Sequence, residues 1–181
     1  MNAHFLIAHA THDWPLVKLI KEQWPDATID CRGVKSLTYR NRIEYAFKLL
    51  RYVWLAFSSG FAALARDPAP AVLCAYSDVE VLGFALARFL RRKRAGIILI
   101  GFIYTTRKSK LTSLLRMAYF RFVLSRTAGV ICHSQLEVKR YTGLIGLGST
   151  RFVNVPYGIN LEIPASIVAA DLGYILTAGR S

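Results

Sequence analysis

Residues 95–104 read Ala-Gly-Ile-Ile-Leu-Ile-Gly-Phe-Ile-Tyr, and this stretch decides the fold class. It is a continuous apolar run, whereas a strand with one face in water alternates apolar and polar residues. Continuous runs of this kind are typical of strands in parallel sheets, which are covered on both faces. We therefore expect Ala95–Tyr104 to be a strand inside such a sheet.

Strand and helix patterns alternate on both sides of this run. Short apolar runs predict further strands at His4–Ala10, Ala27–Val34, Ala71–Tyr76, Gly129–His133 and Arg151–Val155. Longer amphipathic stretches predict helices at Trp14–Trp24, Asn41–Ala65, Ser77–Lys93, Ser109–Thr127 and Gln135–Leu144. Ser77 and Asp78 are typical helix caps, and Gly146 is a typical stop. This alternation predicts an α/β fold with a doubly wound, mostly parallel sheet.

The chain is both apolar and strongly basic. Of its 181 residues 54% are hydrophobic, and its formal net charge is +13. Residues 41–127 hold most of this charge, with 15 basic against four acidic side chains, and aromatic residues lie between the basic ones. Such a surface suits a polyanionic partner, either an anionic membrane or a nucleic acid. The alternative is that the aromatic residues are core and the charges form a solvated rim.

The cysteines, the longest uncharged run and the N-terminus bear on the class of protein and its location. Cys31, Cys74 and Cys132 are odd in number and far apart, so we expect buried, reduced thiols without a disulfide framework or a zinc site. The uncharged run Tyr52–Ala65 is shorter than the roughly 20 residues that cross a bilayer. The N-terminus also lacks the basic and apolar regions of a signal peptide, so we expect a cytoplasmic protein.

Ligands of doubly wound sheets bind at the carboxyl ends of the strands. Polar side chains follow two of the expected strands and are candidates for substrate contact, with nearby backbone turns as the alternative explanation. These side chains are His9 and His12 after the first strand, and Thr105, Thr106 and Arg107 after the central one. Arg107 is a candidate partner for a phosphate. The sequence shows no catalytic triad and no metal cluster with supportive spacing.

Three segments of the last third carry a resemblance to a known family. They are Val130-Ile131-Cys132-His133-Ser134, then Val153-Asn154-Val155-Pro156-Tyr157-Gly158-Ile159-Asn160, and finally Tyr174-Ile175-Leu176-Thr177-Ala178-Gly179-Arg180. In this order and spacing they resemble the middle of family 4 glycosyltransferases of the GT-B fold. The resemblance implies a Rossmann-like N-terminal acceptor-side domain at residues 1–160, a linker at 161–170, and the first strand of a donor-binding domain at 171–181.

The resemblance also implies a function and a set of site residues. The activity would be transfer of a sugar from a nucleotide sugar to a lipid-linked or polysaccharide acceptor, with no cofactor or metal beyond the donor. Donor contacts would come from Arg180, Ser134, Tyr157, Gly158 and Asn160. The loops at 9–13 and 105–107 depart from the family pattern, so family roles do not transfer to them directly. From their position after strands, Thr11 and His12 are expected on the donor side, and His9, Thr105, Thr106 and Arg107 are expected substrate contacts. Ser134 also has a plain alternative as a helix N-cap. Only Gly179–Ser181 follow the last expected strand, so we expect residues 1–181 not to catalyse transfer alone.

The expected partner surface follows from charge and resemblance together. Many transferases of this family act at the cytoplasmic membrane face, so we expect peripheral attachment to an anionic inner membrane surface. The alternative is a non-catalytic basic α/β module that binds anionic lipid or nucleic acid. No signature motif of a nucleic-acid-binding fold is present, which makes nucleic acid the weaker candidate.

Overall fold

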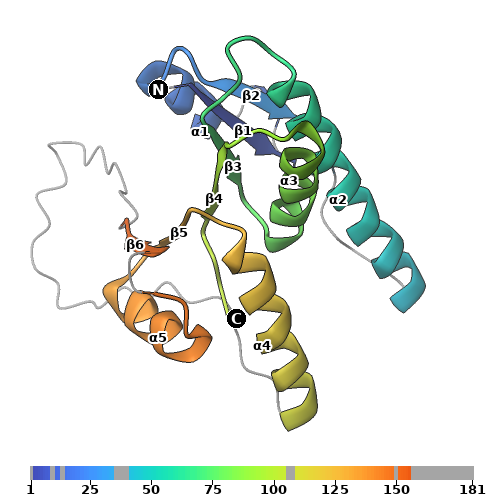
Figure 1. Cartoon of the computed structure of the whole chain (residues 1–181), viewed down its shortest axis with the longest axis vertical. Helices are drawn as coiled ribbons and strands as arrows, with labels where there is room; N and C mark the ends of the chain where they lie inside the picture. The colour runs from blue at the N-terminus through green and yellow to red at the C-terminus, as the bar shows by residue number, and fades with distance from the viewer. Residues whose placement is uncertain are drawn as a thin grey trace, which may run out of the picture.

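The computed structural model describes residues 2–8, 11–12, 15–34, 41–104, 109–148 and 151–155. Strands and helices alternate throughout this part of the chain (Figure 1). The strands are β1 (Ala3–Ile7), β2 (Thr28–Cys31), β3 (Val72–Ala75), β4 (Gly96–Ile100), β5 (Gly129–Cys132) and β6 (Phe152–Asn154). The helices are α1 (Pro15–Gln23), α2 (Arg42–Leu64), α3 (Asp78–Arg91), α4 (Lys110–Ser125) and α5 (Gln135–Ile145).

The six strands form one parallel sheet in the order β2-β1-β3-β4-β5-β6. The chain runs outward from β1 to β2, returns to β3 on the other side of β1, and then continues outward to β6. This reversal is the switch point of a doubly wound sheet. The expected Rossmann-like α/β class is therefore confirmed.

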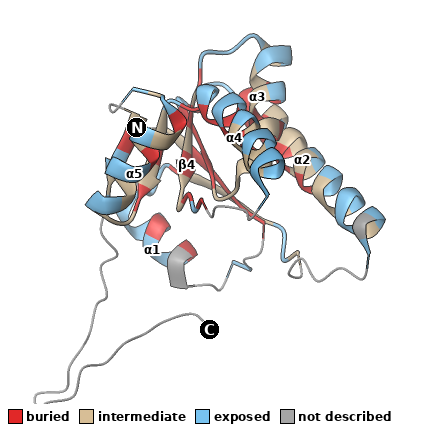
Figure 2. Ribbon diagram, turned by 90° about the horizontal axis from the view of Figure 1, so that it is seen from below, coloured by how far each residue is buried: buried red, intermediate tan, exposed pale blue. Residues whose placement is uncertain are grey.

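The two faces of the sheet carry separate apolar clusters. Alternate residues of each strand point to opposite faces, so Leu6 and Leu73 pack toward α2–α5, whereas Phe5 and Val72 pack toward α1. Burial is concentrated on the sheet and on the helix faces turned toward it (Figure 2). Over β6 the α1 face is open among the described residues, and Val153 is 50% exposed there.

Helices α2 and α3 approach each other closely because α3 carries a glycine at their contact. A Cβ atom at Gly83 would lie 2.4 Å from the carbonyl oxygen of Val53 and 2.6 Å from Cβ of Ala56, both on α2. Ala56 is fully buried at this contact. This tight packing fixes the N-terminal half of α2 beside the carboxyl end of β3.

The structure corrects one boundary of the central strand. We expected a strand over Ala95–Tyr104, but β4 ends at Ile100. The physical reason is Gly101, whose φ of +75° turns the chain out of the sheet. Beyond this turn the backbone N–H of Tyr104 donates to the Tyr141 hydroxyl of α5 at 3.1 Å.

The structure also bears on the expectations about the cysteines, the C-terminal segments and membrane-spanning helices. Cys31, Cys74 and Cys132 are free thiols. Cys74 and Cys132 are buried, as expected, but the expected burial of Cys31 is wrong, because this residue is only partly covered at the end of β2. The linker at 161–170 and the strand expected within 171–181 lie outside the described residues. Among the helices that the structure describes, none is long and apolar enough to cross a membrane.

Candidate functional site

Most of the site residues expected from the sequence fall where the structure gives no description. They are His9, Thr105, Thr106, Arg107, Tyr157, Gly158, Asn160 and Arg180. Thr11, His12 and Ser134 are described, so their placement can be compared with the expectation.

These three residues follow strands at the same edge of the sheet without meeting. Thr11 and His12 are exposed and follow β1, whereas Ser134 follows β5. Strands β3 and β4 lie between β1 and β5, which corresponds to about 14 Å at the usual strand spacing. A ligand would have to span two strands to contact both groups.

The Ser134 side chain acts as a helix N-cap. Its hydroxyl accepts the backbone N–H of Glu137 at 3.1 Å, and the Glu137 carboxylate accepts the backbone N–H of His133 at 2.9 Å. Ser77 and Glu80 form a full capping box at the start of α3, where the Glu80 carboxylate accepts the backbone N–H of Ser77 itself as well as that of Tyr76. The repeat after β3 and β5 shows that the serine–glutamate spacing starts a helix at each position.

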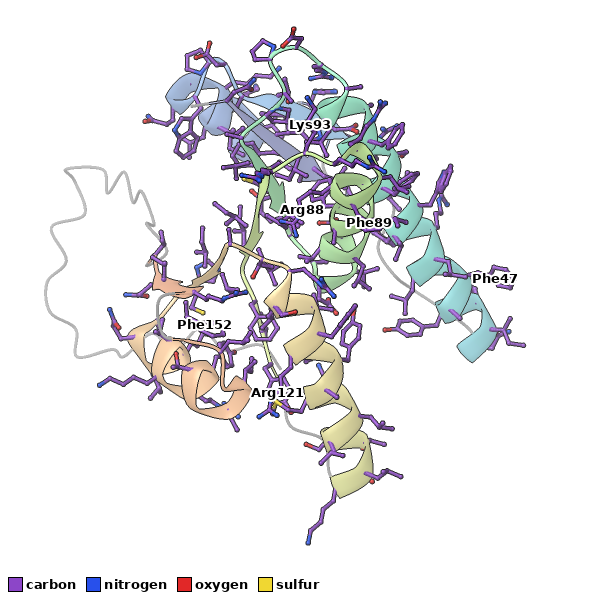
Figure 3. All side chains as sticks on the ribbon, in the orientation of Figure 1. Phe47, Arg88, Phe89, Lys93, Arg121 and Phe152 are labelled. Carbon is purple, nitrogen blue, oxygen red and sulfur yellow. The ribbon has the colours of Figure 1, made fainter. Side chains whose placement is uncertain are left out.

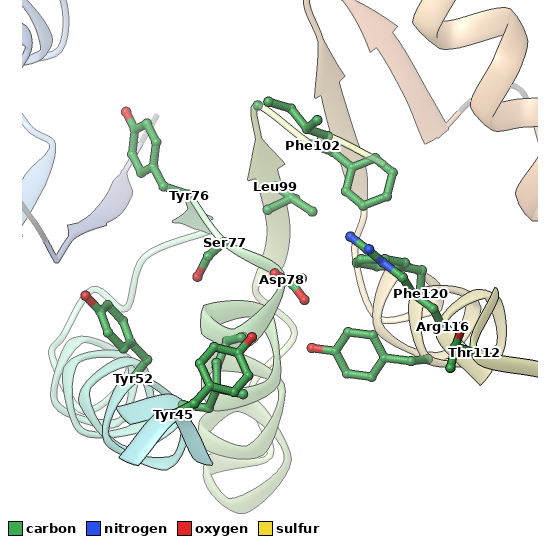
Figure 4. Close-up of a pocket in the computed structure, with 15 residues that line it drawn as sticks. Tyr45, Tyr52, Tyr76, Ser77, Asp78, Leu99, Phe102, Thr112, Arg116 and Phe120 are labelled. Carbon is green, nitrogen blue, oxygen red and sulfur yellow. The ribbon is translucent and has the colours of Figure 1, made fainter. Parts of the chain in front are cut away.

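A pocket that the sequence did not indicate lies over the carboxyl ends of β3 and β4. It has a volume of about 780 Å³, and its walls come from α2, the β3–α3 connection, the end of β4, and α4. Figure 4 shows side chains of α2, α3 and α4 pointing into one space. Aromatic rings dominate the lining: Tyr45, Tyr52, Tyr76, Phe102, Tyr119 and Phe120. We call this the carboxyl-edge pocket.

Two charged groups accompany the rings. Asp78, the first residue of α3, lies near the Tyr119 hydroxyl of α4, and both line the pocket. The Arg116 guanidinium lies 5.3 Å from the ring centre of Phe120 and 5.6 Å from that of Tyr104. A guanidinium that stacks on aromatic rings can still pair with an anion through its N–H groups. The pocket therefore offers flat apolar faces, a carboxylate and a cation together.

A buried carboxyl group supports the floor of the pocket. Glu80 is 2% exposed and accepts the backbone N–H groups of Tyr76 and Ser77, at 2.7 and 3.1 Å. Burial raises the pKa of Glu80 to about 7, although these hydrogen bonds favour its charged form. Burial also raises the pKa of the Tyr52 hydroxyl, and the charge of Glu80 raises it further. Glu80 thus holds the strand-to-helix turn that presents Asp78.

The sequence contained only part of the signal for this pocket. Ser77 and Asp78 follow a predicted strand, and such positions lie at the edge where ligands bind. The aromatic residues of α2 and α4 showed no sign of facing them, because Tyr45 and Tyr119 are far apart in the chain. Only the packing of α2 and α4 beside α3 brings these rings to Asp78.

Metal-ligating side chains do not gather in this region. Across the described ranges, no group of three or more His, Cys, Asp and Glu side chains is placed to hold a metal ion. The described lining of the carboxyl-edge pocket offers stacking, hydrogen bonding and ion pairing. A scan of the chain against protein-family models returned no match, and a search of curated proteins also returned none.

Proposed function

We propose that this chain is the acceptor-side domain of a glycosyltransferase that moves a sugar from a nucleotide sugar to a lipid-linked or polysaccharide acceptor. The observation that carries the proposal is the aromatic carboxyl-edge pocket, formed where parallel α/β sheets bind their ligands. The resemblance of residues 130–134, 153–160 and 174–180 to family 4 glycosyltransferases supports the same conclusion.

The lining of the pocket suits a saccharide. The C–H faces of a sugar ring are apolar and pack on aromatic side chains such as Tyr45 and Phe102, while the hydroxyl groups need polar partners at the ring edge. Asp78 is an acceptor for those hydroxyls, and Arg116 is a donor to a phosphate carried by an acceptor. In this proposal both residues bind and orient the acceptor.

The donor would lie along the same edge of the sheet. Thr11 and His12 after β1 and Ser134 after β5 remain proposed donor contacts, together with Tyr157, Gly158, Asn160 and Arg180. The Ser134 hydroxyl already accepts the Glu137 N–H, so in this role it would use its own O–H as a donor to a phosphate. His9, Thr105, Thr106 and Arg107 remain proposed acceptor contacts.

Ligand-detected NMR tests the acceptor pocket directly. The probes are the methyl glycosides of glucose, galactose, mannose and N-acetylglucosamine, each mixed with the purified chain. We expect saturation transfer from the protein to the C–H protons of at least one glycoside, and a strong reduction in Tyr45→Ala and Asp78→Asn. Phe47→Ala is the matched control, since Phe47 is an exposed aromatic residue of α2 that does not line this pocket.

Two results would contradict the proposal. One is the absence of transfer to every glycoside. The other is transfer that Tyr45→Ala and Asp78→Asn leave unchanged.

We also propose that the chain attaches peripherally to the anionic cytoplasmic face of a membrane. The support is the concentration of basic residues in 41–127, together with large apolar side chains on the surface of α2, α3 and α4. Basic residues beside exposed apolar ones are typical of surfaces that lie in the headgroup region. Sedimentation with anionic vesicles at low salt tests this attachment.

A further inference from the structure

A second groove lies between α3 and α4, at the opposite end of these helices from the carboxyl-edge pocket. The C-terminal halves of α3 and α4 form its walls, and its volume is about 880 Å³. We call it the α3–α4 groove. Helices of a doubly wound sheet run antiparallel to the strands, so this groove lies at the amino ends of the strands, where the proposed transfer reaction needs no residue.

Large apolar side chains of the groove face solvent. Phe89 is 77% exposed, and Leu86, Leu90 and Phe122 are each about half exposed. Figure 3 labels Phe89 on α3, the helix that leads to Lys93. Apolar side chains gathered in a groove, rather than scattered singly, mark a surface that binds something.

The same groove is lined by four cations and by no acid. They are Arg88, Arg92, Lys93 and Arg126. The guanidinium of Arg88 donates to the carbonyl oxygens of Ala95 and Arg126, at 3.2 and 3.4 Å, and Arg126 lies 5.0 Å from the ring centre of Phe122. Within the described residues, neither of the two ion pairs involves these four side chains.

We infer that the α3–α4 groove is the surface by which the chain binds a bilayer of anionic phospholipid. Arg92, Lys93 and Arg126 contact lipid phosphates, while Phe89, Leu90 and Phe122 reach the boundary between headgroups and acyl chains. This inference rests on the membrane attachment proposed above and assigns it to one surface.

The charge of the groove favours an anionic lipid bilayer over a second copy of the chain as its occupant. A symmetric dimer through the groove would place the four cations of one copy against the same four of its partner, which disfavours self-association. An anionic lipid surface supplies the opposite charge at every cation. The groove is therefore complementary to lipid and not to itself.

The other exposed apolar surface is less suited to anionic lipid. Ile43, Phe47, Leu50 and Trp54 form an exposed stripe on α2. Lys48 of this helix is paired with Glu44 at 2.8 Å, so part of the local charge is neutralised, while Arg51 also adjoins the stripe. This stripe lies toward the N-terminal end of α2 and serves as a comparison surface in the test.

Flotation with lipid vesicles tests the assignment. The full chain is mixed with vesicles of phosphatidylcholine and phosphatidylglycerol, or of phosphatidylcholine alone. We expect binding to the anionic vesicles that weakens as salt is raised. Arg92→Gln with Lys93→Gln lowers the partition coefficient by about fivefold for each lost charge. Phe89→Ser lowers it by about tenfold or more, because one large apolar side chain leaves the boundary region.

Matched substitutions on α5 control for net charge and general apolarity. Leu136 is 76% exposed, close to the value for Phe89, so Leu136→Ser removes an equally exposed apolar side chain. Lys139→Gln with Arg140→Gln removes two exposed basic side chains that adjoin in sequence. We expect both controls to bind like the original chain. Circular dichroism and Tm show that each variant is folded.

The outcomes separate the two proposals. If the original chain fails to float with anionic vesicles, the membrane attachment itself is wrong. If it floats but the groove variants bind like the α5 controls, attachment stands and the groove assignment is overturned. Loss of binding in Phe47→Ser, without loss in Phe89→Ser, moves the surface to α2. Tighter binding of duplex DNA with the same dependence on Arg92 and Lys93 identifies a nucleic-acid surface instead.

Discussion

The Tyr119 hydroxyl of α4 lies near the carboxylate of Asp78, the first residue of α3, and its titration is influenced by that charge. This pair joins the two helices whose flanks form both the carboxyl-edge pocket and the α3–α4 groove. Burial raises the pKa of the Tyr119 hydroxyl, and the charge of Asp78 raises it further. The pair therefore links the position of α4 to the proposed acceptor site.

Tyr119→Phe removes the hydroxyl beside Asp78 and keeps the ring. We expect the free energy of unfolding to fall by up to about 1 kcal/mol, the usual net contribution of one side-chain hydrogen bond. A double-mutant cycle with Asp78→Ala, measured by urea unfolding, isolates the pair, and its coupling free energy should be of the same size. Additive effects of the two substitutions would show that the pair is not energetically linked.

Substitutions at Ser134 test whether this side chain stabilises α5 as a helix N-cap. Ser134→Ala leaves the Glu137 N–H without its acceptor, and we expect a loss of about 1 kcal/mol in the free energy of unfolding. Ser134→Asp supplies another good cap and a negative charge at the helix N-terminus, so stability should stay within a few tenths of a kcal/mol. Thermal unfolding of both variants measures this. Equal losses would mean that capping is not the stabilising role of this side chain.

Gly83, the glycine of α3, should not tolerate a side chain. Gly83→Ala places a methyl group against backbone atoms of α2 at Val53 and Phe57, which cannot move independently. We expect a loss of about 1–3 kcal/mol in the free energy of unfolding, typical of overpacking. Gly143→Ala in α5 is the control, because its Cβ meets nothing within 4 Å. That variant should gain up to about 1 kcal/mol from helix propensity.

Two buried groups should give opposite pH dependences of stability. The pKa of Glu80 is raised to about 7. Its contribution to the free energy of unfolding is therefore fully present below its ordinary pKa of 4.5 and is lost as pH rises through 7. The pKa of His4 is lowered by burial to about 4. Its contribution to the free energy of unfolding is therefore fully present above its ordinary pKa of 6.5 and is lost as pH falls through 4. Between pH 4.5 and 6.5 these slopes oppose each other.

Single substitutions should expose each slope. In Glu80→Gln only the His4 slope remains, so the free energy of unfolding rises with pH between 4 and 6.5, by at most about 1.4 kcal/mol per pH unit. In His4→Gln it falls between pH 4.5 and 7. Urea unfolding at a series of pH values measures both slopes. Parallel pH profiles of the two variants would contradict the assignment.

The interleaved aromatic residues of the basic region differ in burial. We considered both core packing and a lipid-facing surface for them from the sequence. Tyr52 and Phe120 are buried, whereas Phe47, Trp54 and Phe122 are exposed. Amphipathic periodicity cannot separate these cases when apolar residues occur on more than one face of a helix. The distinction requires knowing which helix faces the neighbours cover.

The sequence alone determined the order and type of the elements. Apolar run lengths, the serine caps of α3 and α5, and the glycine stop after α5 are local properties of the backbone, so they are visible without the fold. The end of β4 was misjudged because an apolar residue pattern continues past Gly101, and only the positive φ of that glycine takes the chain out of the sheet. The carboxyl-edge pocket and the α3–α4 groove were decided by tertiary structure. Each is formed by side chains from separate helices, and their meeting depends on how closely α2, α3 and α4 pack on one sheet face.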